Sequence, residues 1–370
     1  MVKKLAIIGA APGQKQLCLK AKAMSDVETY CFAWPNGAVC KDIVDHFIPI
    51  SIMEMEKIVD FCKDYGIDGV VSNASEITAE VTAYVSERLG LNGVPHQVLL
   101  NIQDKNWVRV KTRQVKGLSP VRYKQITSSE LKKESHFPFI AKPTHGSSKK
   151  GIYYIETEAQ LHDLKIKADL QNSNFLVEQF ISGHEVSVES ISYHGEHQVV
   201  QVTDKLSTGA PYFAELGHLQ PSHLQKSTQD AIKRIVPSIL ETIGFNNGAS
   251  HIELKIDESE NIYLIEVNPR GGGDMISNEL VALSTDCDYV KAMIDVALNQ
   301  YSFKAIHNTN HVGIHYICKQ NEHLLTYFQK RSQYPFIIRA EYNGEALVDS
   351  TNNYERNGYI LTLDNHRIEL

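Results

Sequence analysis

The stretch that decides the fold is Ile265-Glu266-Val267-Asn268-Pro269-Arg270, followed by Gly271-Gly272-Gly273-Asp274. In an extended strand, the side chains of Glu266, Asn268 and Arg270 point to one face. Carboxylate and amide oxygens are hard ligands that suit Mg²⁺, and a guanidinium is a forked donor that matches phosphate or carboxylate. Consecutive glycines permit close approach of a ligand to the backbone. The stretch therefore predicts a strand face that binds a cation and an anion; the alternative interpretation is a polar, solvent-facing strand edge.

A neighbouring strand carries a second carboxylate. The pattern predicts strands at residues 251–256 and 262–267, joined by the polar turn 257–261. Across such a hairpin Glu253 can face Glu266. Two like charges on one buried face are costly unless a cation lies between them, so the hairpin favours a metal site.

Two weaker signals precede the hairpin. Residues 140–143 read Ile-Ala-Lys-Pro, and a Gly/Ser/Lys loop follows at 146–151. A lysine at a strand end and a loop of backbone N–H groups suit a nucleoside triphosphate. The loop is not a P-loop, because Ile152 and Tyr153 stand where Lys and Ser/Thr are needed; an ordinary hairpin turn is the alternative. Residues 176–189 predict a strand, a turn and a second strand with polar residues at alternate positions, which by itself is typical of an amphipathic strand.

The pattern of predicted secondary structure changes along the chain. The first 75 residues predict strands at 5–8, 27–32 and 69–71 that alternate with helices, which indicates right-handed βαβ units and a parallel sheet. Beyond residue 120 the pattern is β-rich, with strands at 137–142, 152–155, 175–180, 185–193, 198–205, 311–318, 336–342 and 359–363. A long helix is predicted over 231–243, with a kink at Pro237.

Composition excludes several classes of protein. The chain has 370 residues, which suggests two or three domains, and a formal net charge of −7. That charge argues against nucleic acid or an anionic membrane as the main partner. No stretch reaches the ~20 apolar residues of a membrane span, and we find no secretory signal. The six cysteines include no Cys-x-x-Cys pair, so we expect reduced, buried thiols in a cytoplasmic protein.

Taken in order, the three signals resemble the ATP-grasp superfamily, and the pattern is most similar to L-amino-acid ligases and carbamoyl-phosphate-synthase-like members. The resemblance implies an α/β and α+β architecture. Its parts would be a Rossmann-like pre-ATP domain at 1–104, a two-lobed ATP-grasp domain at 105–300 with a flap lobe at about 121–182, and a β-rich C-terminal region at 301–370 packed on the ATP-grasp domain. The flap loop contains fewer glycines than is usual in the family.

The resemblance also implies how ATP and metal would bind. The residues expected near the phosphates are Lys105, Lys142, Ser147 and Ser148. Glu178 is expected beside the adenine and Glu185 at the ribose. The expected Mg²⁺ ligands are Glu253, Glu266 and Asn268, with Glu266 bridging two ions and Mn²⁺ as a substitute. The alternative for Lys105 is an exposed helix lysine.

The implied reaction joins a carboxylate to an amine. The γ-phosphate of ATP would pass to the acid to give an acyl-phosphate and ADP, and the amine would then displace phosphate. The expected catalytic residues are Arg270, Lys142 and Glu266, and the expected substrate-binding residues are His218, Arg270 and Gly272. The alternative for His218, which lies in segment 209–221, is a loop with a surface histidine. Ser75 and Glu76 are interpreted first as a helix start, and second as pocket residues.

Two other functions stay open at this point. One is an ATP-dependent carboxylase of the biotin or purine-pathway type, although no biotin-accepting Met-Lys-Met segment occurs. The other is a module that binds nucleotide without turnover, which has no need for two metal carboxylates. The expected partners are small-molecule acids and amines, with no nucleic acid and no membrane. The sequence does not determine the oligomeric state, for which a homodimer is the commonest arrangement.

Overall fold

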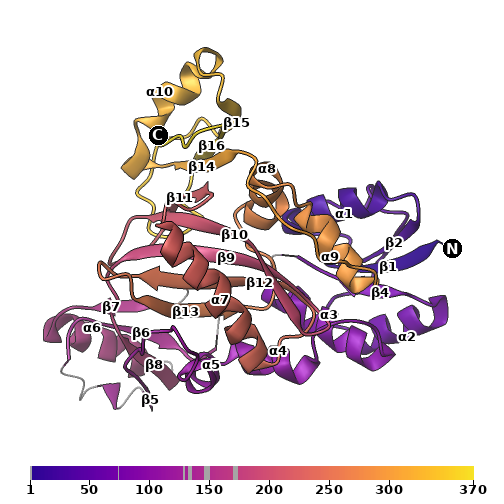
Figure 1. The fold of residues 1–370 in the computed structure, drawn as a ribbon, viewed down its shortest axis with the longest axis horizontal. Coiled ribbons are helices and arrows are strands. Elements are labelled where there is room, and N and C mark those ends of the chain that lie inside the picture. The colour runs from indigo at the N-terminus through magenta and orange to yellow at the C-terminus, as the bar shows by residue number, and fades with distance from the viewer. Residues whose placement is uncertain (1, 74, 128–129, 132–135, 146–150, 170–173) are drawn as a thin grey trace.

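The computed structural model describes residues 2–73, 75–127, 130–131, 136–145, 151–169 and 174–370. Its N-terminal part is built on a parallel four-stranded sheet with the order β3-β2-β1-β4 (Figure 1). The strands are β1 (Lys3–Ile8), β2 (Val27–Phe32), β3 (His46–Ile48) and β4 (Gly69–Val71). The predicted parallel sheet is therefore confirmed.

Helices cover both faces of this sheet. Alternate residues of β1 enter two different cores, with Leu5 and Ile7 on one side and Ala6 and Ile8 on the other. The first core contains α1 (Lys15–Lys22) and α9 (Tyr289–Ala297), and the second contains α2 (Met55–Tyr65) and α3 (Glu76–Leu89). Because α9 comes from late in the chain, it ties the N-terminal sheet to the rest of the molecule.

The largest sheet has eight antiparallel strands with the order β13-β12-β9-β10-β11-β14-β16-β15. The strands are β9 (His184–Tyr193), β10 (Glu196–Ser207), β11 (Glu215–Gln220), β12 (Gly248–Ile256), β13 (Ile262–Asn268), β14 (His311–Ile317), β15 (Ile337–Tyr342) and β16 (Gly358–Asp364). Helix α7 (Lys226–Ile243) buries its apolar stripe against β9 and β12, and it continues across Pro237 (Figure 1). The C-terminal strands continue this sheet through the pairing of β11 with β14.

A second antiparallel sheet, with the order β5-β8-β6-β7, lies within the range predicted for the flap lobe. Its strands are β5 (Tyr123–Thr127), β6 (Phe139–Pro143), β7 (Tyr153–Ile155) and β8 (Asn174–Gln179), and α6 (Glu158–Asp169) packs on them. The predicted pairing of β6 with β7 as a hairpin is confirmed. Ser147 and Ser148 lie outside the described residues.

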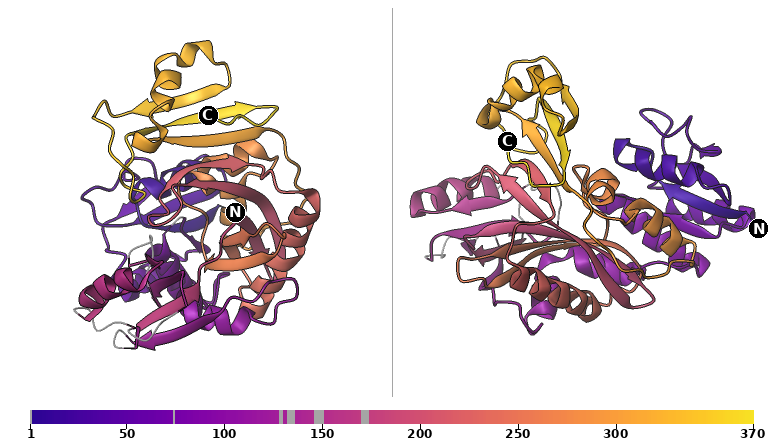
Figure 2. Two further views of the ribbon diagram at one scale, coloured as in Figure 1. Left: turned by 90° about the vertical axis from the view of Figure 1, so that its left-hand side faces the viewer. Right: turned by 45° about the horizontal axis from the view of Figure 1, so that its top comes forward.

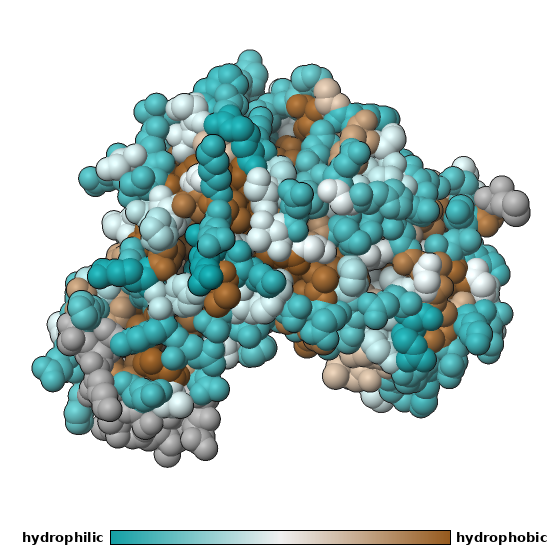
Figure 3. Space-filling model, turned by 60° about the horizontal axis from the view of Figure 1, so that its bottom comes forward, coloured by the Kyte–Doolittle hydropathy of each residue, from teal (hydrophilic) through white to brown (hydrophobic). Residues whose placement is uncertain are grey.

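The remaining helices are α4 (His96–Gln103), α5 (Lys105–Thr112), α8 (Val281–Ser284) and α10 (Leu324–Gln329), with a π-helical turn at Ile276–Leu280. Helix α10 and the C-terminal strands β14, β16 and β15 lie at one end of the large sheet, away from the flap lobe (Figures 1 and 2). The boundaries expected at 104/105 and 300/301 stay a prediction. All six cysteines are free thiols, and all except the half-buried Cys287 are buried as expected. Polar side chains cover most of the face drawn in Figure 3. Across the described residues, we find no helix with the length and apolarity that a membrane crossing requires.

Candidate active site

A cleft of about 470 Å³ lies between the flap lobe and the large sheet, and Glu76 on α3 lines it from the N-terminal part. Its walls come from the N-terminal part, helix α5, the flap lobe and the large sheet. The expected site residues that line it are Lys105, Lys142, Glu178, Glu185, His218, Glu253, Glu266, Asn268 and Arg270. Gly272, which was also expected in the site, does not line the cleft, whereas its neighbours Gly273 and Asp274 do. The fold thus brings together residues up to 165 positions apart in the chain (270 − 105).

The flap side of the cleft holds a buried ion cluster. Lys142 on β6 and Glu178 on β8 lie on neighbouring antiparallel strands, and Lys142 Nζ is 2.6 Å from Glu178 Oε2. Arg109 on α5 pairs with the other oxygen of Glu178 and donates to the Ile265 carbonyl at 3.0 Å. Burial alone would raise the pKa of Glu178, but Arg109 and Lys142 lower it to about 2. Glu178 is therefore ionised and fixes both cations at the cleft wall.

The face that is predicted to bind metal belongs to β12 and β13, on which Glu253 and Glu266 are register partners. Lys105 Nζ is 3.1 Å from Glu266 Oε1, so Lys105 enters the cleft instead of lying exposed. Lys105 begins α5, and the Asp104 side chain caps that helix by accepting from the backbone N–H groups of Asn106 and Trp107.

Lys205 on β10 forms a second cluster behind this face. Its side chain is 2% exposed, and Nζ lies 2.7 Å from Glu253, 2.9 Å from Glu185 and 3.2 Å from Glu215. Burial alone would lower the pKa of Lys205, but Glu253, Glu185 and Glu215 raise it well above its usual value. A permanent cation therefore holds three carboxylates together.

Arg270 joins the N-terminal part to the cleft. Its guanidinium donates to Glu76 Oε1 from Nη2 at 2.6 Å and from Nε at 3.0 Å. Burial alone would raise the pKa of Glu76, but Arg270 lowers it. Ser75 caps α3 by accepting from the Thr78 N–H, so both interpretations of this pair hold: Ser75 starts the helix and Glu76 lines the cleft.

The opposite end of the cleft is a mixed cluster of acids and bases. His218 on β11 is fully buried, with Nε2 3.4 Å from Glu215 and 3.7 Å from Asp274. Arg356 donates to Asp274 at 3.0 Å and stacks on the Tyr316 ring at 3.6 Å. Burial alone would lower the pKa of His218, but Asp274 and Glu215 raise it. The alternative of a loop with a surface histidine is wrong, because pairing with β10 and β14 makes β11 an interior strand.

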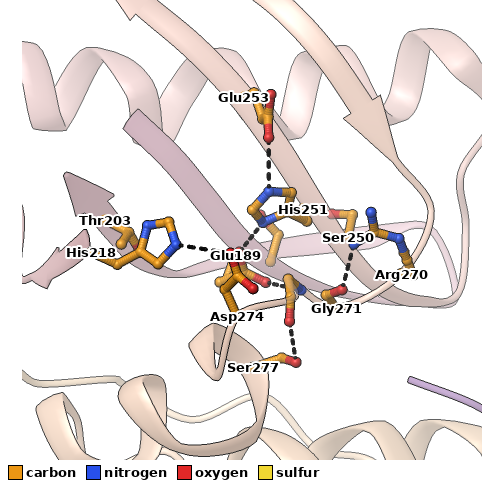
Figure 4. Close-up of polar contacts among 12 residues, drawn as sticks. Glu189, Thr203, His218, Ser250, His251, Glu253, Arg270, Gly271, Asp274 and Ser277 are labelled. Atoms are coloured by element: carbon orange, nitrogen blue, oxygen red, sulfur yellow. Dashed lines mark hydrogen bonds and ion pairs between the residues drawn. The ribbon is translucent and has the colours of Figure 1, made fainter. Parts of the chain in front are cut away.

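A buried chain of contacts links Glu253 on β12 to the glycine-rich loop (Figure 4). His251 Nδ1 contacts Glu189, and its Nε2 is 3.4 Å from Glu253. The second oxygen of Glu189 accepts from the Gly272 N–H at 2.9 Å. Burial alone would lower the pKa of His251, but Glu189 and Glu253 raise it to about 9.

Sequence reasoning missed several of these residues. Arg109 had a usable signal, because it lies four residues after Lys105 and so on the same face of one helix. No local sequence signal singled out Lys205, Glu215 or Asp274 as site residues. Arg356 contacts Asp274 across 82 positions, a separation at which no local pattern predicts contact.

The residues present fit a divalent cation. Glu253, Glu266 and Asn268 supply hard oxygen donors on one strand pair. Each of the two carboxylates contacts an ammonium, Glu253 that of Lys205 and Glu266 that of Lys105. The face is therefore built to meet positive charge.

Fold and site together define a protein that contains an ATP-grasp domain. Residues 135–279 match the family model described as the ATP-grasp domain, and the whole chain adopts the ATP-grasp fold predicted from its motifs.

Known proteins of similar sequence and structure extend this result. The chain is 28% identical over 253 residues to alanine–anticapsin ligase of Bacillus subtilis, a match that covers 60% of this chain and 53% of that protein. The chain thus spans about half the length of the curated relatives it matches. The L-amino acid ligase of Bacillus licheniformis superposes with a TM-score of 0.80 at 22% identity, over 98% of this chain and 94% of that one. N5-carboxyaminoimidazole synthetase of Staphylococcus aureus, complexed with ADP, superposes with a TM-score of 0.77 at 16% identity, over 98% and 94%.

Proposed function

We propose that this protein is an ATP- and Mg²⁺-dependent ligase that joins a carboxylate to an amine through an acyl-phosphate and releases ADP and phosphate. The observation that carries the proposal is the meeting of two carboxylates in register, Glu253 and Glu266, with Lys142 and Arg270 in one cleft. Oxygen ligands for a cation and donors for anions are thus held in one cleft. Such a site accelerates phosphoryl transfer by positioning and charge neutralisation.

Each wall then has a task. Lys105 and Lys142 bind the phosphates, with Ser147 and Ser148 proposed to cover them. Glu185 meets the ribose, and Glu178 lies on the adenine side, where it also fixes Lys142. Glu253, Glu266 and Asn268 would hold two Mg²⁺ ions, for which Mn²⁺ can substitute. Bound Mg²⁺ supplies charge neutralisation at the phosphates.

Arg270 acts on the acid substrate. Its guanidinium faces the cleft from the glycine-rich loop and is oriented by Glu76. We assign it to the charge that develops on the acyl-phosphate and on the oxyanion formed when the amine attacks. The amine would approach from the end lined by His218, where Glu215 and Asp274 can balance a positive charge.

We propose amino acids as the substrates. The support is the similarity to alanine–anticapsin ligase and to an L-amino acid ligase, together with an end of the cleft that offers both acidic and basic side chains. An α-amino acid carries both complementary charges.

The test is phosphate release from Mg²⁺ and ATP across a grid of single and paired amino acids, with mass detection of products. Release that needs a pair, and a product one water lighter than the sum of the two, would establish the ligase. Release with bicarbonate and no pair would favour the carboxylase. Mg²⁺-dependent ATP binding with no release in any mixture would favour the binding module.

A further inference from the structure

The glycine-rich loop and the metal-binding strand share one buried anchor. Glu189 on β9 and His251 on β12 are register partners, fully buried and 5% exposed respectively. One oxygen of Glu189 contacts His251 Nδ1, and the other accepts the Gly272 N–H at 2.9 Å. The other nitrogen of His251 lies 3.4 Å from Glu253. Two parts of the site are therefore joined through Glu189, which does not line the cleft, and His251, which does.

The loop is held from its other side as well. The Ser277 hydroxyl lies 2.6 Å from the Gly272 carbonyl and 3.1 Å from Asn73 Oδ1, so the N-terminal part also contacts this loop (Figure 4). The fit is tight: a Cβ at Gly272 would lie 2.8 Å from Glu189 Oε1 and 2.8 Å from His251 Nδ1. Contacts with Glu189 and His251 thus fix the position of Gly272. Because Arg270 and Asp274 are two residues away in the same loop, their backbone positions depend on that of Gly272.

We propose that the buried Glu189–His251 pair is a positioning unit that fixes the glycine-rich loop, and with it Arg270, relative to the metal-binding carboxylate Glu253. This inference rests on the proposed function and adds to it residues that act through others. A ligand held in one orientation by a buried partner binds metal better than a free one, and removing such a partner typically lowers metal affinity or activity 10- to 100-fold.

The variants are chosen to break single links. Glu189→Gln keeps the size of the side chain but has one oxygen, so it cannot accept from both the Gly272 N–H and His251. Gly272→Ala attacks the same link from the loop, and its φ lies outside the left-handed region, so the backbone tolerates alanine. Ser190→Ala is the matched control, because Ser190 is the next residue on β9, fully buried, and its hydroxyl has no hydrogen-bond partner among the described residues.

The first measurement needs neither metal nor turnover. Hydrogen exchange of the full-length protein is followed in the peptide that spans residues 269–277. We expect Glu189→Gln and Gly272→Ala to accelerate exchange there at least about 10-fold, the loss of a protecting bond, and Ser190→Ala to leave it unchanged. Unchanged exchange in both loop-link variants would overturn the proposal.

The second measurement is the Mg²⁺ concentration that half-saturates binding of a non-hydrolysable ATP analogue, taken well below each variant's Tm. We expect a rise of about 10-fold for Glu189→Gln, and no larger rise for the double variant with Gly272→Ala, because both changes break one link. Two results would refute the positioning role and leave the proposed function standing. One is a half-saturating Mg²⁺ concentration in the variants equal to that of the wild type. The other is a rise in the double variant that equals the product of the two single rises. Absence of Mg²⁺-dependent binding in the wild type would refute the proposed function, and this inference with it.

Discussion

Replacing Lys205 by methionine removes the cation at the centre of three carboxylates. Lys205 is 2% exposed and lies within 3.2 Å of Glu253, Glu185 and Glu215. Methionine has a similar length and no charge, so the packing of the side chain changes little while the carboxylates lose a shared counter-charge. His251 and Arg356 still contact Glu253 and Glu215, so the loss is that of one partner in a network.

The expected cost follows from the burial of the cluster. Removing one partner of a buried ion pair typically costs about 3–5 kcal/mol, because it leaves buried charge uncompensated. A cooperative unit of 150–250 residues loses roughly 2–4 °C in Tm per kcal/mol. We therefore expect Lys205→Met to lower the Tm by about 6 °C or more. Added Mg²⁺ should restore more of the Tm in this variant than it adds to the wild type, because the ion supplies positive charge at Glu253.

Thermal unfolding followed by circular dichroism, with and without Mg²⁺, measures both effects. Lys226→Met is the control, because the side chain of this lysine is 88% exposed and its ammonium lies 3.3 Å from Asp230 on the surface. This substitution should change the free energy of unfolding by less than about 0.5 kcal/mol. A Tm for Lys205→Met within 2 °C of the wild type, by the same ~2–4 °C per kcal/mol scale, would show that the cluster does not depend on its cation.

Three further predictions concern single side chains. Arg270→Ala should lower kcat for phosphate release by roughly 10²–10³-fold, the scale for losing one preorganised donor; a variant with more than half of the wild-type rate would remove Arg270 from the mechanism. Glu178 has a folded-state pKa of about 2 against 4.5 in the unfolded chain, so its contribution is complete above pH 4.5 and is lost as the pH falls toward 2. In urea titrations, Glu178→Gln should abolish about 3 kcal/mol of this acid dependence, and an unchanged slope would contradict the ion cluster. Burial lowers the pKa of His315 from 6.5 to about 4, so its neutral form stabilises the fold above pH 6.5 and this contribution is lost between pH 6.5 and 4. His315→Gln should flatten the stability profile in that window, and a profile parallel to the wild type would refute it.

The parts of the fold that sequence predicted are those with local signals. The hairpin of β12 and β13 has apolar residues at alternate positions and a short polar turn, and together these fix the register that pairs Glu253 with Glu266. Strand β2 was predicted at its observed bounds, and its residues include Val27, Tyr30 and Phe32, which are of types that favour strands. Gly66 and Gly90 end α2 and α3 in the left-handed conformation, as their positions indicated.

Other features have no local signal. Strand β11 reads Glu-Leu-Gly-His-Leu-Gln, which has the polarity of a loop, yet every residue except Leu216 is buried. Glu215 and His218 face other charges in the cleft, and Gln220 bonds to buried hydroxyl groups, so the usual link between polarity and exposure fails. The contact of Arg109 with Glu178 spans 69 positions, and only the assembled fold can bring such residues together.

The ion pairs of the cleft indicate how binding of the nucleotide and binding of the metal could favour each other. Lys105 contacts Glu266, and Lys142 contacts Glu178, so two proposed phosphate ligands are paired with carboxylates. A phosphate alone would draw Lys105 away from Glu266, and a metal alone would draw Glu266 away from Lys105. When both bind, the carboxylate would face the metal and the lysine would face the phosphate. Bound metal would therefore raise the affinity for the nucleotide, and by linkage bound nucleotide would raise the affinity for the metal by the same factor. The same exchange explains why an ion-paired cleft is compatible with binding a highly charged nucleotide.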